Sequence, residues 1–224
     1  MNDVILETHD LTKHYGGVFA LEAADFTLHK SEHVAIMGDN GAGKSTFVRQ
    51  ITGVEHRTRG NIIFDGEEVS FDGPLAAREA GIETVFQTLA LADNLDAPSN
   101  LFLGRELTNK FGLVDDARME AETRKIMARL NPNFKKISEP VSALSGGQRQ
   151  SVAIARAVYF NAKILIMDEP TAALGVHESK MVADLIKELK AQGLGIFLIS
   201  HDIHDVFDLA DRVCVMKNGQ VVGT

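Results

Sequence analysis

The chain has 224 residues, of which 45% are hydrophobic and 24% charged, and its formal net charge is −8. This is enough apolar material for one folded domain, and the acidic balance argues against a protein that mainly binds nucleic-acid phosphates. The single cysteine excludes an internal disulfide, and no apolar run approaches the roughly 18 residues that cross a bilayer. We expect no secretory signal, because residues 1–10 are acidic and lack a basic start.

Short strands are predicted over about the first sixty residues. Residues 25–29 alternate polar and apolar side chains, and residues 62–69 carry Asp-Gly between apolar positions, which indicates a hairpin. Residues 34–37 form an apolar run before a glycine-rich loop and predict a buried strand. A helix is expected over residues 44–52, with Gly53 as its C-terminal cap.

The middle and the end of the chain alternate between helical and strand patterns. Apolar stripes predict helices over residues 116–130 and 181–189, and a further helix is expected over residues 148–159. Residues 164–167 and 196–199 are apolar throughout and predict buried strands. Such alternation is typical of an α/β protein with a largely parallel sheet.

The order of these elements predicts one domain built from two parts. A nucleotide-binding core is expected to combine residues 1–87 with residues 159–224, and a helical subdomain is expected to be inserted over residues 88–158. Asn218-Gly219 predicts a hairpin turn near the end of the core.

A phosphate-binding loop is predicted between the strand at residues 34–37 and the following helix. The stretch from Gly38 to Ser45 fits G-x-x-x-x-G-K-[ST] without a mismatch. Its glycines allow backbone N–H groups to face phosphate oxygens, and the helix directs its positive end to the same place. The lysine would reach the β- and γ-phosphates, and the serine hydroxyl would hold Mg²⁺. The expected set is Gly38, Asp39, Asn40, Gly41, Ala42, Gly43, Lys44, Ser45 and Thr46.

Polar residues at the ends of predicted strands supply a candidate metal and water site. Asp168 ends the strand at 164–167 and would face Mg²⁺, while the adjacent Glu169 would polarise the attacking water. Gln87 and His201 follow two other strands, so they would lie at the same edge of a parallel sheet. Gln87 is expected to bind Mg²⁺ and the water, and His201 to contact the γ-phosphate or orient Glu169. Each of these polar residues, taken alone, is equally compatible with a solvated turn. Together with the phosphate loop they indicate a Mg·ATP site, because the metal needs a carboxylate opposite the phosphates.

A second anion site is predicted at the start of another helix. A serine followed by two glycines offers a hydroxyl, free N–H groups and a helix dipole. A chain with one phosphate loop and one further phosphate-binding helix start suggests a nucleotide shared between two subunits. The residues of this motif are Ser145, Gly146, Gly147 and Gln148.

Five motifs occur along the chain in the order phosphate loop, Gln87, Ser145 to Gln148, Asp168-Glu169 and His201. Together they resemble the nucleotide-binding subunits of ABC transporters over essentially the whole chain. The resemblance implies the P-loop NTPase fold of ABC ATPases, with a mixed-sheet core, an N-terminal antiparallel β part and an inserted helical subdomain. It implies ATP and Mg²⁺ as cofactors and a head-to-tail dimer, a homodimer by expectation, in which ATP lies between the phosphate loop of one subunit and Ser145 to Gln148 of the other. It also assigns adenine stacking to Tyr15.

The stretches at residues 87–95, 101–106 and 171–176 are similar to those of bacterial importers of the ribose, galactose, xylose and fructose type. This implies a membrane permease as partner, a sugar-binding protein as an indirect partner, no nucleic acid, and a place on the cytoplasmic face of the membrane. Gly175 stands where most ABC subunits carry aspartate, which puts the usual coupling across the dimer in doubt. The resemblance also implies a further C-terminal helix.

Two functions other than transport are known for proteins with these motifs, and both fit the sequence less well. A soluble ABC ATPase acting on nucleic acid or ribosomes would usually carry long coiled coils, zinc-binding cysteines or two linked ATPase domains, and the sequence lacks these patterns. A non-catalytic regulator would usually lack the lysine, the glutamate or the histidine, whereas Lys44, Glu169 and His201 are all present.

Overall fold

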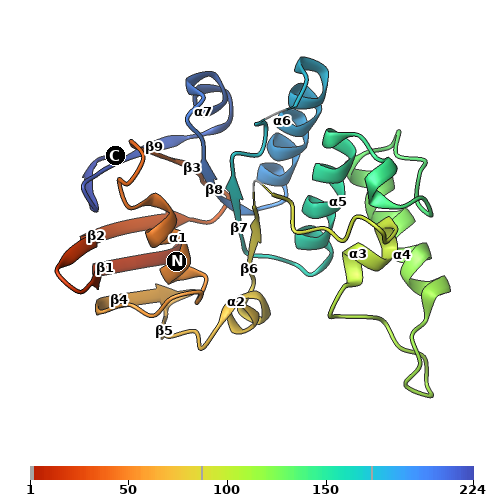
Figure 1. Cartoon of the computed structure of the whole chain (residues 1–224), viewed down its shortest axis with the longest axis horizontal. Helices are drawn as coiled ribbons and strands as arrows, with labels where there is room; N and C mark the ends of the chain where they lie inside the picture. Colours follow the sequence, from red (N-terminus) through yellow and green to blue (C-terminus); the bar gives the residue numbers. More distant parts are fainter. Residues whose placement is uncertain (1–2, 87, 173) are drawn as a thin grey trace.

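The computed structural model describes residues 3–86, 88–172 and 174–224, which form two β-sheets and flanking helices. Figure 1 shows the smaller sheet at one end of the molecule, helices α3, α4 and α5 at the other, and the larger sheet between them. The helices are α1 (Lys44–Ile51), α2 (Pro74–Ala80), α3 (Ala97–Phe102), α4 (Asp116–Leu130), α5 (Gly146–Tyr159), α6 (Val176–Ala191) and α7 (Ile203–Leu209), with a 3₁₀ turn η1 (Val141–Ala143).

The smaller sheet is antiparallel and has the strand order β2-β1-β4-β5. The prediction of short strands is wrong for its two longest members, which have 12 residues each. These strands contain buried polar residues that interrupt the apolar pattern, so their full length is not evident from the sequence. One of them is Thr8, whose hydroxyl donates to the carbonyl of Ala24 on the paired strand at 2.9 Å. The strands are β1 (Val4–Tyr15), β2 (Val18–His29), β4 (Arg59–Phe64) and β5 (Glu67–Val69).

The larger sheet has the order β10-β9-β3-β8-β7-β6, and all its pairs are parallel except β10 with β9. This confirms the mixed α/β fold, the buried strands and the hairpin at Asn218-Gly219. The parallel strands bring their carboxyl ends to one edge, where the functional residues lie. The strands are β3 (His33–Met37), β6 (Ile82–Val85), β7 (Ile164–Asp168), β8 (Gly195–Ile199), β9 (Arg212–Lys217) and β10 (Gln220–Gly223).

Both faces of this larger sheet are buried, which explains why its strands are apolar throughout rather than alternating. Leu165 and Met167 of β7 belong to the core that contains α4, α5 and α6, whereas Ile164 and Ile166 belong to the core beneath the antiparallel sheet and α1. Phe197 points to the second core, where its ring packs 5.1 Å from Phe26 and 6.2 Å from Phe47. The two cores fix β7 and β8 between them, so their ends are held in place.

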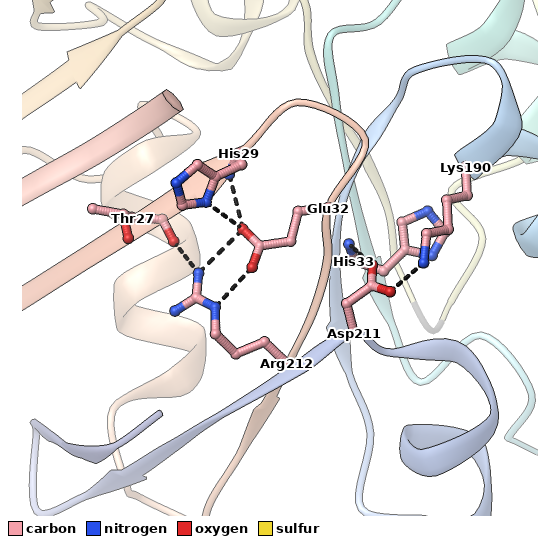
Figure 2. Close-up of polar contacts among 7 residues, drawn as sticks. All are labelled: Thr27, His29, Glu32, His33, Lys190, Asp211 and Arg212. Atoms are coloured by element: carbon pink, nitrogen blue, oxygen red, sulfur yellow. Dashed lines mark hydrogen bonds and ion pairs between the residues drawn. The ribbon is translucent and has the colours of Figure 1, made fainter. Parts of the chain in front are cut away.

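The turn between β2 and β3 joins the two sheets through charged contacts. Arg212, at the start of β9, pairs with Glu32 at 2.7 Å and donates to the carbonyl of Thr27 at 2.5 Å (Figure 2). Glu32 also accepts from the backbone N–H of His29 at 2.9 Å. Burial alone would raise the pKa of Glu32, but the hydrogen bonds from Arg212 and His29 outweigh it and lower that pKa to about 2.

A second polar group beside this turn holds the start of β3 against β9. The backbone N–H of His33 donates to the Asp211 carboxylate at 3.0 Å, and the Asp211 carboxylate pairs with Lys190 of α6 (Figure 2). The His33 ring is buried near the carbonyl of Leu209, and burial lowers its pKa. These contacts position β3, whose far end opens into the phosphate-binding loop.

α1 and α4 agree closely with the sequence-based expectations, whereas α2, α3 and α7 were not expected. Two helices begin earlier than expected. One is α6, which starts at Val176 rather than at residue 181. α5 starts at Gly146 rather than at residue 148, because the Ser145 side chain caps it and both glycines join its first turn. No helix in residues 3–86, 88–172 and 174–224 is long and apolar enough to cross a membrane. The bounds of a helical subdomain at residues 88–158 stay a prediction.

Candidate functional site

The predicted phosphate-binding loop lies between the end of β3 and the start of α1. Gly43 is the N-cap of α1 and has φ 104°, in the left-handed region that glycine tolerates. A Cβ on Gly43 would lie 2.8 Å from the carbonyl oxygen of Ala20 on β2. Only glycine therefore lets the loop pass this close to β2 and leaves the first N–H groups of α1 pointing into the loop.

The ammonium group of Lys44 is held at the rim of this loop. Its Nζ atom donates to the carbonyl oxygens of Gly38 at 2.6 Å and Asp39 at 3.0 Å. A lysine at this place adds a positive charge to a concave set of backbone N–H groups, which together form an anion-binding site.

Two acidic residues follow β7 at the edge of the sheet next to the loop. Asp168 is the last residue of β7 and pairs in register with Ile199 of β8. Glu169 adopts φ 51°, a left-handed conformation that turns the chain sharply after the strand, and its N–H donates to the carbonyl of Ile199 at 2.8 Å. This turn brings the Glu169 carboxylate beside the second residue after the end of β8.

That residue is His201, whose side chain and backbone both bind Glu169. The His201 Nδ1 atom lies 2.6 Å from Oε1 of Glu169, and the His201 N–H donates to the same oxygen at 3.2 Å. The hydrogen bond and the negative charge of Glu169 raise the pKa of His201. Of the two roles expected for His201, the contact with Glu169 is therefore formed in the structure.

The loop and the strand ends enclose a cleft of about 800 Å³. Burial raises the pKa of Asp168 and the nearby charge of Glu169 raises it further, while Lys44 acts in the opposite direction. Asp168, Glu169 and Lys44 thus share a partly buried space. The cleft is lined by Ala20, Gly38, Asp39, Asn40, Gly41, Ala42, Gly43, Lys44, Ser45, Thr46, Asp168, Glu169, Ile199 and His201.

The residues expected to bind Mg²⁺ fit that ion in chemical type. Ser45 and Asp168 line the same cleft and offer a hydroxyl and a carboxylate oxygen, the hard ligands that Mg²⁺ prefers. No group of three or more His, Cys, Asp or Glu side chains in the described part of the chain is arranged as a metal site. Mg²⁺ in proteins is commonly held by substrate phosphates together with one or two protein carboxylates. Gln87, the third expected ligand, lies outside the described residues.

Tyr15 does not line this cleft, and its expected contact with adenine stays a prediction. It ends β1, is 47% exposed, and its hydroxyl donates to the Glu55 carboxylate. Lys13 lies over its ring at 5.1 Å from the centroid. The hydrogen bond to Glu55 raises the pKa of the Tyr15 phenol, so the group stays neutral.

The predicted second anion site lies apart from the cleft, at the start of α5. Ser145 and Gln148 form a capping box: the Gln148 N–H donates to the Ser145 hydroxyl at 3.4 Å, and the Ser145 N–H donates to the Gln148 side chain at 3.0 Å. Gly146 lines a second cavity of about 530 Å³, and Glu169 lines both cavities. Ser145 to Gln148 therefore do not reach the phosphate loop of their own subunit's cleft.

Comparison with known proteins decides the family. Residues 21–172 match the family model described as "ABC transporter". The chain is 45% identical over 218 residues to the xylose/arabinose import ATP-binding protein XylG of Sulfolobus acidocaldarius, which covers 97% of this chain and 86% of that protein. The chain belongs to the ABC transporter family. Its cleft joins the phosphate loop to the acidic end of β7.

Other ABC transporter proteins support the same assignment. The chain is 45% identical to the fructose import ATP-binding protein FrcA of Rhizobium meliloti over 96% of this chain and 86% of that protein. A ribose import ATP-binding protein RbsA of Yersinia pestis is 42% identical, and this chain spans 44% of its length. A nucleotide-free ATP-binding cassette superposes with a TM-score of 0.87 at 28% identity, covering 98% of this chain and 90% of that one.

The structure adds site residues that sequence reasoning missed. Ala20 and Ile199 line the cleft but carry no chemical signal, because only the packing of β2 and β8 brings them there. Glu178 is different. Its carboxylate accepts from the N–H of Gly175, the N-cap of α6, at 3.3 Å. A glutamate three residues after the N-cap is one half of a capping box and could have been found in the sequence, but glycine has no side chain to form the other half.

Proposed function

We propose that the chain is the ATP-hydrolysing motor subunit of an ABC importer for carbohydrates. The observation that carries this proposal is the cleft in which the phosphate-binding loop meets Asp168, Glu169 and His201. One side of the cleft suits phosphate binding and the other suits activation of water.

The binding half of the mechanism rests on the loop and Lys44. Backbone N–H groups at the start of α1 would hold the β- and γ-phosphate oxygens, and Lys44 would exchange its carbonyl partners for those oxygens. Ser45, Asp168 and Gln87 would hold Mg²⁺, which when bound neutralises charge on the phosphates during transfer. A cation there would also relieve the raised pKa of Asp168 by stabilising its ionised form.

The chemical half rests on Glu169 and His201. Glu169 would accept a hydrogen bond from the attacking water and orient it in line with the γ-phosphate, so that the P–O bond to ADP breaks as the bond to water forms. His201 would hold the Glu169 carboxylate through its 2.6 Å contact and present its other ring nitrogen to the γ-phosphate. Tyr15 would stack on adenine at the outer side of the site.

A second copy of this chain would complete each site. Ser145 to Gln148 form an anion site at the start of α5 that is separate from the cleft, which favours a nucleotide contacted by two subunits. A dimeric ATP-binding cassette in a post-hydrolysis state, bound to ADP and phosphate, superposes on this chain with a TM-score of 0.82 at 25% identity. We therefore propose a head-to-tail homodimer.

The proposed substrate class comes from the relatives. Their names state import of xylose or arabinose, of fructose and of ribose. A permease in the membrane and, indirectly, a sugar-binding protein would be the partners, and this chain would work at the cytoplasmic face. The net charge of −8 gives no support to nucleic acid as a partner.

The test is phosphate release by the purified chain with Mg·ATP, measured across a range of protein concentrations. Turnover per subunit should rise with concentration as dimers form, and Ser145→Arg should abolish both turnover and ATP-driven dimerisation. Full turnover in a strictly monomeric, dilute sample would contradict the shared site, and no phosphate release at any concentration would favour a regulator. For the substrate class, uptake of labelled pentoses and hexoses should fail in cells that carry only a Glu169→Gln chain.

A further inference from the structure

The end of β1 lies close to the phosphate-binding cleft without lining it. Tyr15 is the last residue of β1 and pairs in register with Val18 of β2. Two residues further along β2, Ala20 lines the cleft. Because a strand rises about 3.4 Å per residue, the Tyr15–Val18 pair lies roughly 7 Å from Ala20 along the strand. The Tyr15 ring, which is 47% exposed, is therefore within reach of the rim of the cleft.

The segment that joins α1 to β4, residues 52–58, holds this end of β1 in place. The Thr58 N–H donates to the Thr12 carbonyl at 2.8 Å, and the His14 N–H donates to the Thr58 hydroxyl at 3.3 Å. Both contacts fix the backbone of β1, and neither involves the Tyr15 side chain. A separate group in the same segment is needed to orient the ring.

That group is the carboxylate of Glu55. Its Oε2 atom accepts a hydrogen bond from the Tyr15 hydroxyl, and its Oε1 atom accepts one from Arg49 at 3.2 Å. The Glu55 N–H also donates to the Arg49 carbonyl at 3.1 Å. Arg49 lies in the last turn of α1, the helix that begins in the phosphate loop. Glu55 therefore ties the Tyr15 ring to the helix that carries the phosphate site.

Lys13 restricts the same ring from another side. Its Nζ atom lies 5.1 Å from the centroid of the Tyr15 ring and donates to the His56 carbonyl at 2.7 Å. An ammonium group over an aromatic face is attracted by the π electrons of the ring. A flat base that stacks on Tyr15 would take the face that Lys13 does not cover. With one face covered and the hydroxyl bound to Glu55, the ring has a defined orientation in the free protein.

We propose that Glu55 is a positioning residue, which holds the Tyr15 ring for the adenine base and joins this stacking platform to α1. The inference rests on the proposed function, because it takes Tyr15 as the residue on which adenine stacks. Glu55 acts through Tyr15 and has no part in the reaction itself. Fixing a side chain loses rotamer entropy, and a ring that is already fixed in the free protein loses less of it on binding. Glu55 therefore strengthens the binding of ligands that carry a base and leaves that of bare phosphates unchanged.

The test compares the binding of Mg·ADP and of magnesium pyrophosphate to the full chain by calorimetry. Both ligands present a diphosphate group to the loop, and only ADP carries a base. Glu55→Ala should raise the Kd of Mg·ADP by roughly three- to ten-fold, the worth of one hydrogen bond, and should leave the Kd of pyrophosphate unchanged. Tyr15→Phe, which keeps the ring but loses the hydroxyl, should have the same effect. The control is Glu120→Ala, which removes a carboxylate paired with Arg124 on α4 and should change neither Kd.

A double variant separates positioning from a general loss of structure. Because Tyr15→Phe already lacks the hydroxyl, adding Glu55→Ala should raise the Kd of Mg·ADP no further. Tyr15→Phe also keeps the contact between Glu55 and Arg49, so it gives the same reading if Glu55→Ala lowers the melting temperature.

Three results would overturn the proposal: additive effects in the double variant, an equal loss of pyrophosphate binding, or an unchanged affinity for Mg·ADP in both single variants. Tyr15→Ala tests the platform itself, and native affinity for Mg·ADP in that variant would show that adenine does not stack on Tyr15. A native chain that binds neither ligand would contradict the proposed function as a whole. This result differs from a chain that binds both ligands without any effect of Glu55.

Discussion

The Nδ1 atom of His201 lies 2.6 Å from Oε1 of Glu169, although 32 positions separate the two residues in the chain. The contact forms because β7 and β8 are parallel neighbours in register, so the residues that follow their ends meet at one edge. It joins the expected water-activating carboxylate to an imidazole that holds it in place.

The first prediction concerns the Glu169 carboxylate. Glu169→Gln keeps a hydrogen-bond acceptor for His201 but removes the base, so phosphate release should slow by about 10²–10⁴-fold while nucleotide binding is retained. Single-turnover phosphate release and binding of a fluorescent nucleotide measure the two effects separately. Glu120→Gln, which removes a carboxylate paired with Arg124 on α4, serves as the control. Turnover equal to that of the control would show that Glu169 is not the base that activates the attacking water.

The second prediction concerns the charge state of His201. Because Glu169 favours the imidazolium, the pKa of His201 should lie above its ordinary value of 6.5. The stabilising contact should be fully present below the ordinary value and should be lost as the pH rises through the raised one. An NMR titration of the His201 ring should show this, and the midpoint should fall in Glu169→Gln but not in Glu120→Gln. A His201 titration midpoint that is the same in Glu169→Gln as in the native chain would show that the pair does not form in solution.

The third prediction concerns the close approach of the phosphate loop to β2. Gly43→Ala places a Cβ against the Ala20 carbonyl in a left-handed conformation, so the loop must move at a cost of about 1–3 kcal/mol. Nucleotide binding should fall sharply and the melting temperature should drop. Gly112→Ala is the control, because Gly112 also has a positive φ but nothing lies within 4 Å of its added Cβ. Equal nucleotide affinity in the two variants would contradict the steric argument.

The fourth prediction concerns acid stability. Glu32→Gln breaks the charged contact with Arg212, and a loss of about 1–2 kcal/mol should lower the melting temperature by roughly 3–6 °C near neutral pH. The folded pKa of Glu32 is about 2 and its ordinary value is 4.5, so its contribution is present above pH 4.5 and is lost as the pH falls towards 2. The melting curves of the native chain and the variant should therefore converge in acid. Glu122→Gln, which removes a half-buried charge paired with Lys125 on α4, should show no such pH-dependent difference.

The sequence was sufficient to predict the buried strands of the larger sheet and the motifs that follow them. A short continuous apolar run such as residues 164–167 predicts a strand buried on both faces, and the G-x-x-x-x-G-K-S spacing needs a strand before it and a helix after it; β7, β3 and α1 follow these patterns. The antiparallel sheet was harder to predict. Its long strands bury polar residues such as Thr8, whose hydrogen bond forms only after β1 and β2 have paired.

The sequence by itself determined which chemical groups the protein possesses: a phosphate loop, a carboxylate pair at a strand end, a histidine after a strand, and a serine-glycine helix start. Only the tertiary structure decided which of them meet. Lys44, Asp168, Glu169 and His201 share one cleft because parallel strands end together, whereas Ser145 lies at the start of α5, outside the residues that line this cleft. The physical reason is that local patterns specify elements through propensity and burial, while contacts between distant residues depend on strand order and packing, which no local spacing encodes.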